Sequence, residues 1–128
     1  MTMNDGVVIW LRGAAPDAVA ALAHGLSGAI CWPAGADMVC MVAPQAGEHL
    51  SVCVARVAAI VGRQGVALGL AVGPLPSAGQ VNPTAERAQR AAALAAAGDV
   101  ILAWGSQAYL AGEFESVAAG FVKLIELP

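Results

Sequence analysis

The order in which short apolar runs alternate with longer helical patterns constrains the fold of this chain more than any other feature. Apolar runs rich in β-forming residues indicate buried strands. They lie at residues 6–13, 29–33, 38–43, 66–72 and 100–104, and residues 114–127 hold one or two more. The second and third runs are joined by Ala-Gly-Ala-Asp, which is typical of a hairpin turn.

Helical patterns occupy most of the sequence between these runs. They lie at residues 16–25, 45–64 and 82–98, with a shorter one at 106–112. Asn82 suits an N-cap and Pro83 suits the first helical position after it. In the middle helix an apolar face recurs every three to four residues, and His49, Arg56 and Arg63 share another face. We expect that second face to be solvated.

The resulting order is β-α-β-β-α-β, followed by α-β-α-β. Its first six elements match the split β-α-β, or ferredoxin-like, plan. We therefore expect an α+β fold with a ferredoxin-like βαββαβ core and a C-terminal α-β extension, built on a mainly antiparallel sheet with helices on one face. A length of 128 residues suits a single domain, taken here as residues 1–128.

Composition and charge argue against several classes of protein. Hydrophobic residues make up 59% of the chain, and the mean hydropathy is +0.71. No uninterrupted apolar run reaches the roughly 20 residues of a membrane-spanning helix, and the N-terminus lacks the basic region of a signal peptide. We expect a cytoplasmic protein without a membrane span. The net charge of −3 argues against nucleic acid as a binding partner. Charged residues, at 12%, are too few to cover the surface, which favours a protein partner.

The cysteines and histidines do not predict a catalytic or metal site. Cys31, Cys40 and Cys53 are odd in number, show no CxxC spacing and fall in apolar segments. We expect reduced, buried thiols rather than a metal or redox role. His24 and His49 have no serine or cysteine at a spacing that indicates a catalytic pair.

Several strings, taken in order, resemble the class III adenylyl/guanylyl cyclase homology domain. VALGLAVGPL resembles the family's central strand and the loop after it, and QVNPTAERAQR resembles the helix start at which the family carries an Asn and an Arg. GDVILAWGSQAYLAGEFESVAAGFVKLIELP resembles the C-terminal run of strand, short helix, Phe-Glu strand and Val-Lys-Leu strand. The hairpin string GADMV also resembles the Gly-Gly-Asp-Glu-Phe of diguanylate cyclases, which share the same core, although the Glu is missing.

The resemblance implies a chemistry that can be compared residue by residue. In the family two carboxylates hold two divalent metals, a Lys and an acid or amide read the purine, an Asn orients the ribose, and an Arg neutralises charge on the phosphates. Asp37 matches the second metal carboxylate and is the candidate metal ligand. Leu11 and Arg12 stand where the first carboxylate is expected. A purely structural Asp37 that serves the turn is the favoured interpretation.

The nucleotide-contacting positions are also altered. Pro33 lies near the place of the purine-reading Lys, and Glu86 stands where the Arg is expected. Asn82 matches the ribose Asn, and Arg87 follows one residue late, so these two remain the candidates for nucleotide binding. We expect no catalytic residue and no cofactor, with Mg²⁺ or Mn²⁺ required only if the domain is an active cyclase.

These replacements lead to the hypothesis of a catalytically degenerate cyclase-like domain that acts as a regulatory or dimerisation module, with weak nucleotide binding at most. One alternative is an active class III cyclase that converts ATP or GTP to the cyclic nucleotide with an unusual set of site residues. Another is a self-associating ferredoxin-like module without a nucleotide. The family forms its active sites between two domains, so the expected partner is a second copy or a related cyclase-type domain. We expect the interface around Trp32, Met38, Met41 and Leu75.

Overall fold

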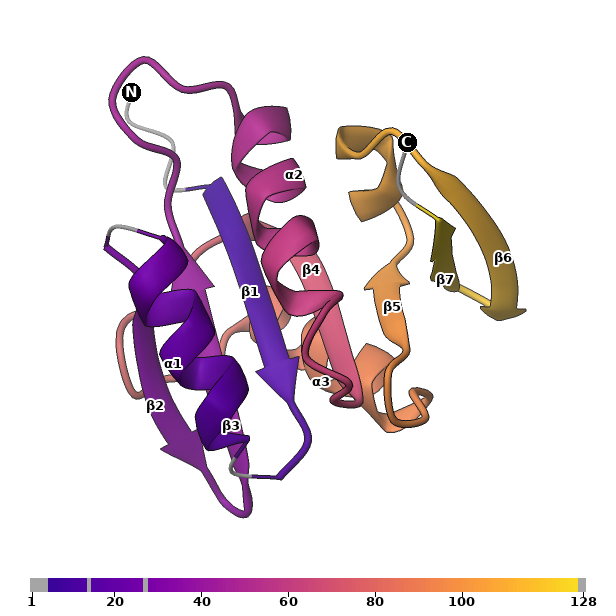
Figure 1. The fold of residues 1–128 in the computed structure, drawn as a ribbon, viewed down its shortest axis with the longest axis horizontal. Helices are drawn as coiled ribbons and strands as arrows, with labels where there is room; N and C mark the ends of the chain where they lie inside the picture. Colours follow the sequence, from indigo (N-terminus) through magenta and orange to yellow (C-terminus); the bar gives the residue numbers. More distant parts are fainter. Residues whose placement is uncertain (1–4, 14, 27, 127–128) are drawn as a thin grey trace.

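The computed structural model describes residues 5–13, 15–26 and 28–126, and its strands form one seven-stranded sheet (Figure 1). In chain order the elements are β1 (Asp5–Leu11), α1 (Pro16–Gly25), β2 (Ile30–Ala34), β3 (Asp37–Val42), α2 (Leu50–Val61), β4 (Leu68–Pro74), α3 (Pro83–Ala93), β5 (Val100–Ala103), the 3₁₀ helix η1 (Ser106–Tyr109), β6 (Glu113–Ala118) and β7 (Phe121–Glu126). Across the sheet the strands follow the order β2-β3-β1-β4-β5-β7-β6.

The first six elements form the ferredoxin-like βαββαβ core that the sequence predicts. β2, β3, β1 and β4 are neighbours in that order, and each neighbouring pair is antiparallel. The β4–β5 pair is parallel, with α3 as the crossover between the two strands. The extension then adds η1 and the antiparallel β6–β7 hairpin. The α+β class and the mainly antiparallel sheet are therefore confirmed.

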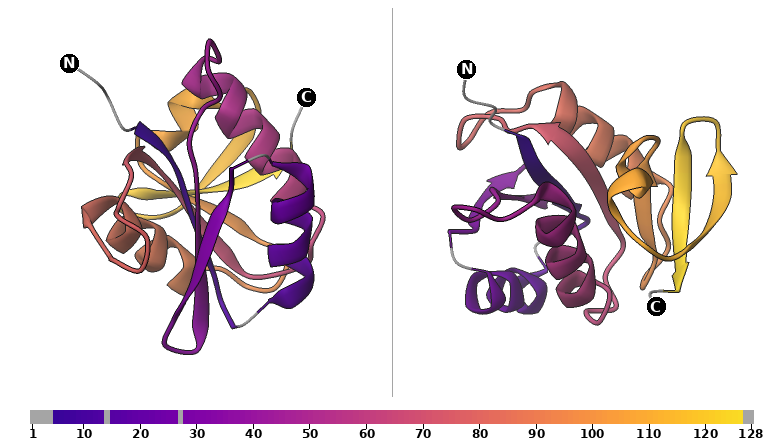
Figure 2. Two further views of the ribbon diagram at one scale, coloured as in Figure 1. Left: turned by 90° about the vertical axis from the view of Figure 1, so that its left-hand side faces the viewer. Right: turned by 90° about the horizontal axis from the view of Figure 1, so that it is seen from above.

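Helices cover both faces of this sheet (Figure 2). Side chains alternate along β1, so that Val7 and Ile9 join the core beneath α1 and α2, whereas Val8 and Trp10 join a second core with α3. The expectation that the helices share one face holds for α1 and α2 only, because α3 packs on the opposite face against β4 and β1. No helix in the described part of the chain has the length and apolarity needed to cross a bilayer.

The opposite face accepts α3 because β4 presents its smallest residues there. Gly69 lies directly beneath α3, and a Cβ added to it would lie 2.8 Å from the Cβ of Ala91. The facing side of the helix is equally small, since Ala85, Ala88 and Ala92 are buried against the sheet. The alanine-rich sequence of this helix is thus explained by its close approach to the strand, rather than by helix propensity alone.

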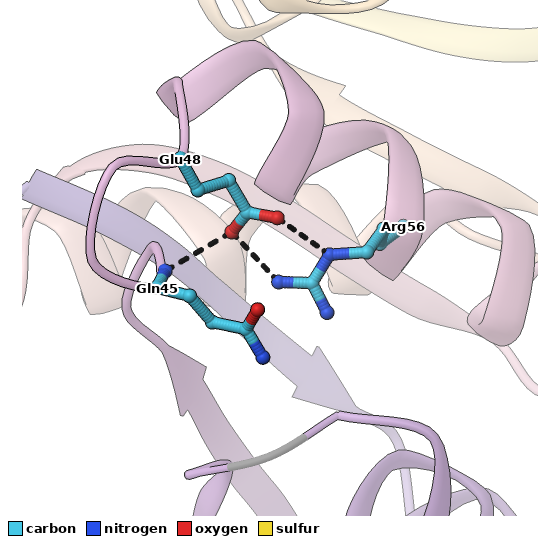
Figure 3. Close-up of polar contacts among 3 residues, drawn as sticks. All are labelled: Gln45, Glu48 and Arg56. Atoms are coloured by element: carbon cyan, nitrogen blue, oxygen red, sulfur yellow. Dashed lines mark hydrogen bonds and ion pairs between the residues drawn. The ribbon is translucent and has the colours of Figure 1, made fainter.

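The loop before α2 carries an ion pair between Glu48 and Arg56 (Figure 3). Arg56 donates from Nε to Oε2 of Glu48 at 2.8 Å and from Nη2 to Oε1 at 2.7 Å, and the backbone N–H of Gln45 donates to Oε1 at 3.1 Å. The backbone turns at Gly47, where φ is 76°. The helix therefore begins at Leu50 rather than at residue 45. Arg56, expected on a solvated face, is instead bound to the loop.

This ion pair predicts a pH-dependent contribution to stability. The hydrogen bonds from Arg56, and then the one from Gln45, lower the pKa of Glu48. A carboxylate whose pKa is lower in the folded state stabilises that state above its unfolded pKa, and the contribution is lost as the pH falls through the folded value. We expect Glu48→Gln to lower Tm near neutral pH and the difference to vanish in acid. Thermal unfolding of both proteins between about pH 7 and about pH 3 measures this. A difference that persists unchanged in acid contradicts it.

The cysteines correct one expectation. Cys31 and Cys40 are direct cross-strand partners in the β2–β3 pair, with Cα atoms 4.1 Å apart, and they form a disulfide. The turn at Gly35 and Ala36 lies midway between them, so the hairpin register brings the two side chains together. Cys53 is a buried free thiol on α2, as expected, and burial raises its pKa.

Candidate functional site

Asp37 begins β3 at the tip of the β2–β3 hairpin. Its Oδ2 accepts a hydrogen bond from the indole Nε1 of Trp10 at 2.8 Å, and its Oδ1 accepts one from the backbone N–H of Gly13 at 2.8 Å. Gly35, with φ of 62°, makes the turn that brings Asp37 back toward β1. Both carboxylate oxygens therefore tie the hairpin tip to the end of β1. The sequence indicated the position of Asp37 but not its partner Trp10, which lies 27 residues away.

An open depression surrounds this end of β1. It has a volume of about 550 Å³. Small residues line it together with one cation and one anion: Gly13, Ala36, Gly65, Ala97, Arg12 and Asp37. Arg12 donates from Nη1 to the carbonyl oxygen of Ala95 at 2.7 Å, which fixes its guanidinium beside the chain that leaves α3. The depression therefore has no net charge from these two groups.

The donor atoms in the depression do not fit a two-metal centre. The expected place of a first carboxylate, at the end of β1, holds the buried Leu11 and the cationic Arg12. Magnesium is commonly held by one or two carboxylates together with substrate phosphates, and here the single carboxylate already accepts two hydrogen bonds. Over residues 5–13, 15–26 and 28–126, no group of three or more His, Cys, Asp or Glu side chains is placed to hold a metal ion.

Asn82 and Arg87 lie together at the start of α3. Asn82 is the N-cap, because its Oδ1 accepts from the N–H of Ala85 at 3.0 Å. Its Nδ2 donates to the carbonyl oxygen of Pro74 at 2.9 Å. Arg87 is half-buried and donates from Nη2 to the carbonyl oxygen of Val72 at 3.1 Å. Both side chains fasten α3 to the end of β4. The sequence predicted the cap and missed both contacts with the strand.

One copy of the chain does not bring Asp37 together with Asn82 and Arg87. The antiparallel register pairs Asp5 with Pro74 at one end of β1 and Leu11 with Leu68 at the other. Asn82 contacts the first end through Pro74, and Asp37 contacts the second through Gly13. A strand of seven residues separates its ends by about 20 Å at roughly 3.3 Å per residue. A site that uses all three residues therefore needs a second chain.

Three of the four residues expected at an interface share one face of the sheet. Trp32 belongs to the core cluster on the α3 side, and Met41 and Leu75 pack against it. Ile30, 46% exposed, is the cross-strand partner of Met41. We refer to Ile30, Trp32, Met41 and Leu75 as the hairpin face. Met38 lies on the opposite side of the sheet, against the core beneath α1 and α2. The structure thus separates Met38 from the other three.

The indole of Trp32 is a buried donor on the hairpin face. Its side chain is 8% exposed, and its Nε1 has no hydrogen-bond partner among the residues that the structure describes. An indole N–H donates and cannot accept, and a buried donor left unpaired costs about 1–3 kcal/mol. An acceptor supplied by a molecule seated on this face would remove that cost.

Comparison with known proteins places the chain by its fold. No family model and no curated protein sequence matches it. Among solved structures, the monomeric guanylyl cyclase domain of the RhoGC fusion protein from the aquatic fungus Blastocladiella emersonii matches with a TM-score of 0.71 at 10% identity, over 97% of this chain and 96% of that one. A dimeric form of that fungal domain matches with a TM-score of 0.63 at 12% identity, over 97% of this chain and 95% of that one.

A third similar structure is the catalytic core of a rhodopsin-guanylyl cyclase with converted specificity, in complex with ATPαS. It matches with a TM-score of 0.63 at 11% identity, over 97% of this chain and 96% of that one. The matches cover nearly the whole of both partners, so the β5-to-β7 extension belongs to the shared fold as well as the βαββαβ core. The chain has the fold of the class III guanylyl cyclase catalytic domain.

Proposed function

We propose that this chain is a catalytically degenerate cyclase-like domain that acts as a regulatory or dimerisation module. The observation that carries the proposal is the state of Asp37, whose two carboxylate oxygens accept hydrogen bonds from Trp10 and Gly13. A carboxylate held in this way stabilises the hairpin tip. The neighbouring residues supply no second carboxylate to share a metal pair, and two-metal chemistry needs both metals to be held.

The positions that would contact a nucleotide support the same proposal. Pro33 offers no polar side-chain atom, and Glu86 is exposed in the first turn of α3, where its charge would repel a phosphate. Arg87 has a suitable charge, but its Nη2 already donates to the carbonyl oxygen of Val72. Together these contacts favour weak nucleotide binding at most.

Association with a second copy, or with a related cyclase-type domain, is the role that the surface favours. β2 and β3 carry Ile30, Trp32 and Met41 of the hairpin face, and Leu75 follows β4, on the side of the sheet where α3 covers mainly β4, β1 and β5. Large apolar residues there lie beside the indole N–H of Trp32, which has no hydrogen-bond partner among the described residues. One of the similar fungal cyclase domains is dimeric. A partner on the hairpin face would cover apolar surface and supply an acceptor to Trp32.

The direct test of this proposal is an activity measurement. We expect the purified protein to make no detectable cyclic AMP or cyclic GMP from ATP or GTP with Mg²⁺ or Mn²⁺, because the first metal carboxylate is replaced by Leu11 and Arg12. Chromatographic detection of the cyclic product measures it. Turnover that Asp37→Ala abolishes would show that Asp37 works as a metal ligand, and would overturn the proposal.

The same variant gives a control that does not depend on turnover. Asp37→Ala leaves the Trp10 indole and the Gly13 N–H without their acceptor, so we expect it to lower the free energy of unfolding by about 1–3 kcal/mol. This loss should be equal with Mn²⁺ and with a chelator. A metal ligand would behave differently, since Mn²⁺ would then raise the Tm of the unsubstituted protein and not that of the variant.

A second candidate function is a self-associating module with no nucleotide at all. The engagement of both Asn82 and Arg87 with β4 favours it, since a nucleotide would have to displace those contacts. Thermal unfolding with ATP and with GTP separates the two candidates. A ligand that binds only the folded state raises Tm by mass action, so a rise supports the degenerate cyclase and its absence supports the nucleotide-free module.

A further inference from the structure

The β2–β3 hairpin carries a disulfide whose two cysteines pack against the same core and differ in burial. Cys40 lies on β3, is fully buried and belongs to the core beneath α1 and α2. Cys31 lies on β2 at the edge of the sheet and is half-buried. We propose that Cys31 and Cys40 form a reversible thiol–disulfide site that fastens the edge strand β2 to the sheet, with Cys31 as the sulfur at which exchange begins.

The edge strand depends on this bond more than an internal strand would. β2 has only five residues, and β3 is its sole neighbour in the described sheet. Pro33 lies within it and has no N–H to donate. Ile30 and Pro33 are exposed, so Trp32 is the one large side chain that anchors the strand by burial. Short edge elements with few buried contacts open locally more readily than the core does.

The difference in burial determines which of the two sulfurs a thiolate attacks first. A small thiol such as glutathione, as its thiolate, attacks the Sγ of Cys31, because Cys31 is half-buried whereas Cys40 is fully buried. The Cys31–Cys40 bond breaks, and the Cys40 sulfur leaves with the electron pair and takes a proton. A second glutathione thiolate then attacks the mixed disulfide, which releases glutathione disulfide and the thiol of Cys31. The protein gains two electrons and two protons, and glutathione disulfide reverses both steps.

Cys53 provides an internal reference. It is a free thiol in the same protein, fully buried on α2. Burial raises its pKa, which keeps it in the unreactive thiol form. Reagents that report exchange at Cys31 should therefore leave Cys53 untouched while the protein stays folded.

Release of β2 would also alter the hairpin face, because Ile30 and Trp32 both belong to this strand. In that respect the inference rests on the proposed function, and reduction would weaken association. The redox site itself does not depend on that function. Thiol counts and amide exchange test the site, whereas the cyclase assay tests the function, so failure of one is distinguishable from failure of the other.

The test is equilibration of the native protein in buffers of reduced and oxidised glutathione. After acid quenching and alkylation under denaturing conditions, peptide mass spectrometry should show Cys53 alone as a free thiol at the oxidised limit and all three cysteines free at the reduced limit. Intermediate buffers should trap the glutathione adduct on Cys31. A disulfide that resists glutathione until the protein unfolds, or an adduct found on Cys40, overturns the proposal.

Hydrogen exchange supplies the structural readout. Reduction should speed amide exchange in β2 by about tenfold or more while leaving β4 unchanged. The double substitution Cys31→Ser with Cys40→Ala should show the fast rate in every buffer, and Cys53→Ala should respond to glutathione as the unsubstituted protein does. If the double variant does not fold, reduction of the unsubstituted protein carries the test alone. Equal exchange of β2 in both redox states overturns the fastening role.

Discussion

Replacing Gly69 with alanine is expected to lower the free energy of unfolding by about 3 kcal/mol or more, the upper range for overpacking a core. An added Cβ would collide with the backbone of α3 at Ala88 and Ala92, and would lie 2.8 Å from the Cβ of Ala91. Backbone atoms cannot move aside as a flexible side chain can. The helix would have to lift from β4, and the buried alanine contacts along it would be lost together.

Gly79→Ala is the matched control for this substitution. Gly79 lies in the exposed loop between β4 and α3, has φ of 82°, and an added Cβ there would meet nothing within 4 Å among the described residues. Its cost is the left-handed backbone alone, about 1–2 kcal/mol. Thermal and urea unfolding of both variants gives the comparison. Equal losses for the two would contradict the close packing of α3 on Gly69.

The order of elements was predictable because each strand and helix is marked by local features. The run 66–72 is apolar at every position except Gly69, so it reads as a strand with no exposed face. That reading implies cover on both sides of β4. The ferredoxin-like plan fixes only α1 and α2, so the expectation of helices on one face does not extend to α3. The glycine beneath α3 was the available signal for the opposite face.

The candidate site was harder to predict because its contacts are long-range. The position of Asp37 in a hairpin turn follows from local sequence, but its bond to Trp10 depends on how β1 and β3 align in the sheet. The same holds for Arg87, which reaches Val72 only after α3 has docked on β4. A motif comparison identifies the matching positions, and it does not reveal whether a side chain is already engaged.

The sequence also carries a signal for the disulfide, namely the register of the β2–β3 hairpin. A two-residue turn at Gly35 and Ala36 pairs Ala34 with Asp37 and then each residue outward in step. Cys31 and Cys40 are equally far from that turn and must face each other on one side of the hairpin. The number of cysteines and the absence of CxxC spacing were weaker guides than this register.

The apolar hairpin face predicts that the chain assembles with a second copy. We expect the protein to be a dimer in solution, with an interface that includes the hairpin face and buries at least ~1,000 Å² in total. Leu75 is half-buried beside Gly6, where an added Cβ would lie 2.8 Å from Leu75 Cδ1. An arginine in place of Leu75 would put an unpaired charge in the interface. A penalty of about 3 kcal/mol, within the range for a buried unpaired charge, weakens the dimer roughly 100-fold.

Light scattering and sedimentation of Leu75→Arg, at concentrations near the dissociation constant of the unsubstituted dimer, measure this effect. Val52→Arg is the matched control, because Val52 is 49% exposed on α2, on the other side of the sheet from the hairpin face. We expect a monomer from the first variant and an unchanged dimer from the second, with both folded by circular dichroism. An unsubstituted protein that is monomeric at micromolar concentration would end the homodimer proposal. A dimer lost with Val52→Arg and kept with Leu75→Arg would instead place the interface on α2, away from the Trp32 indole.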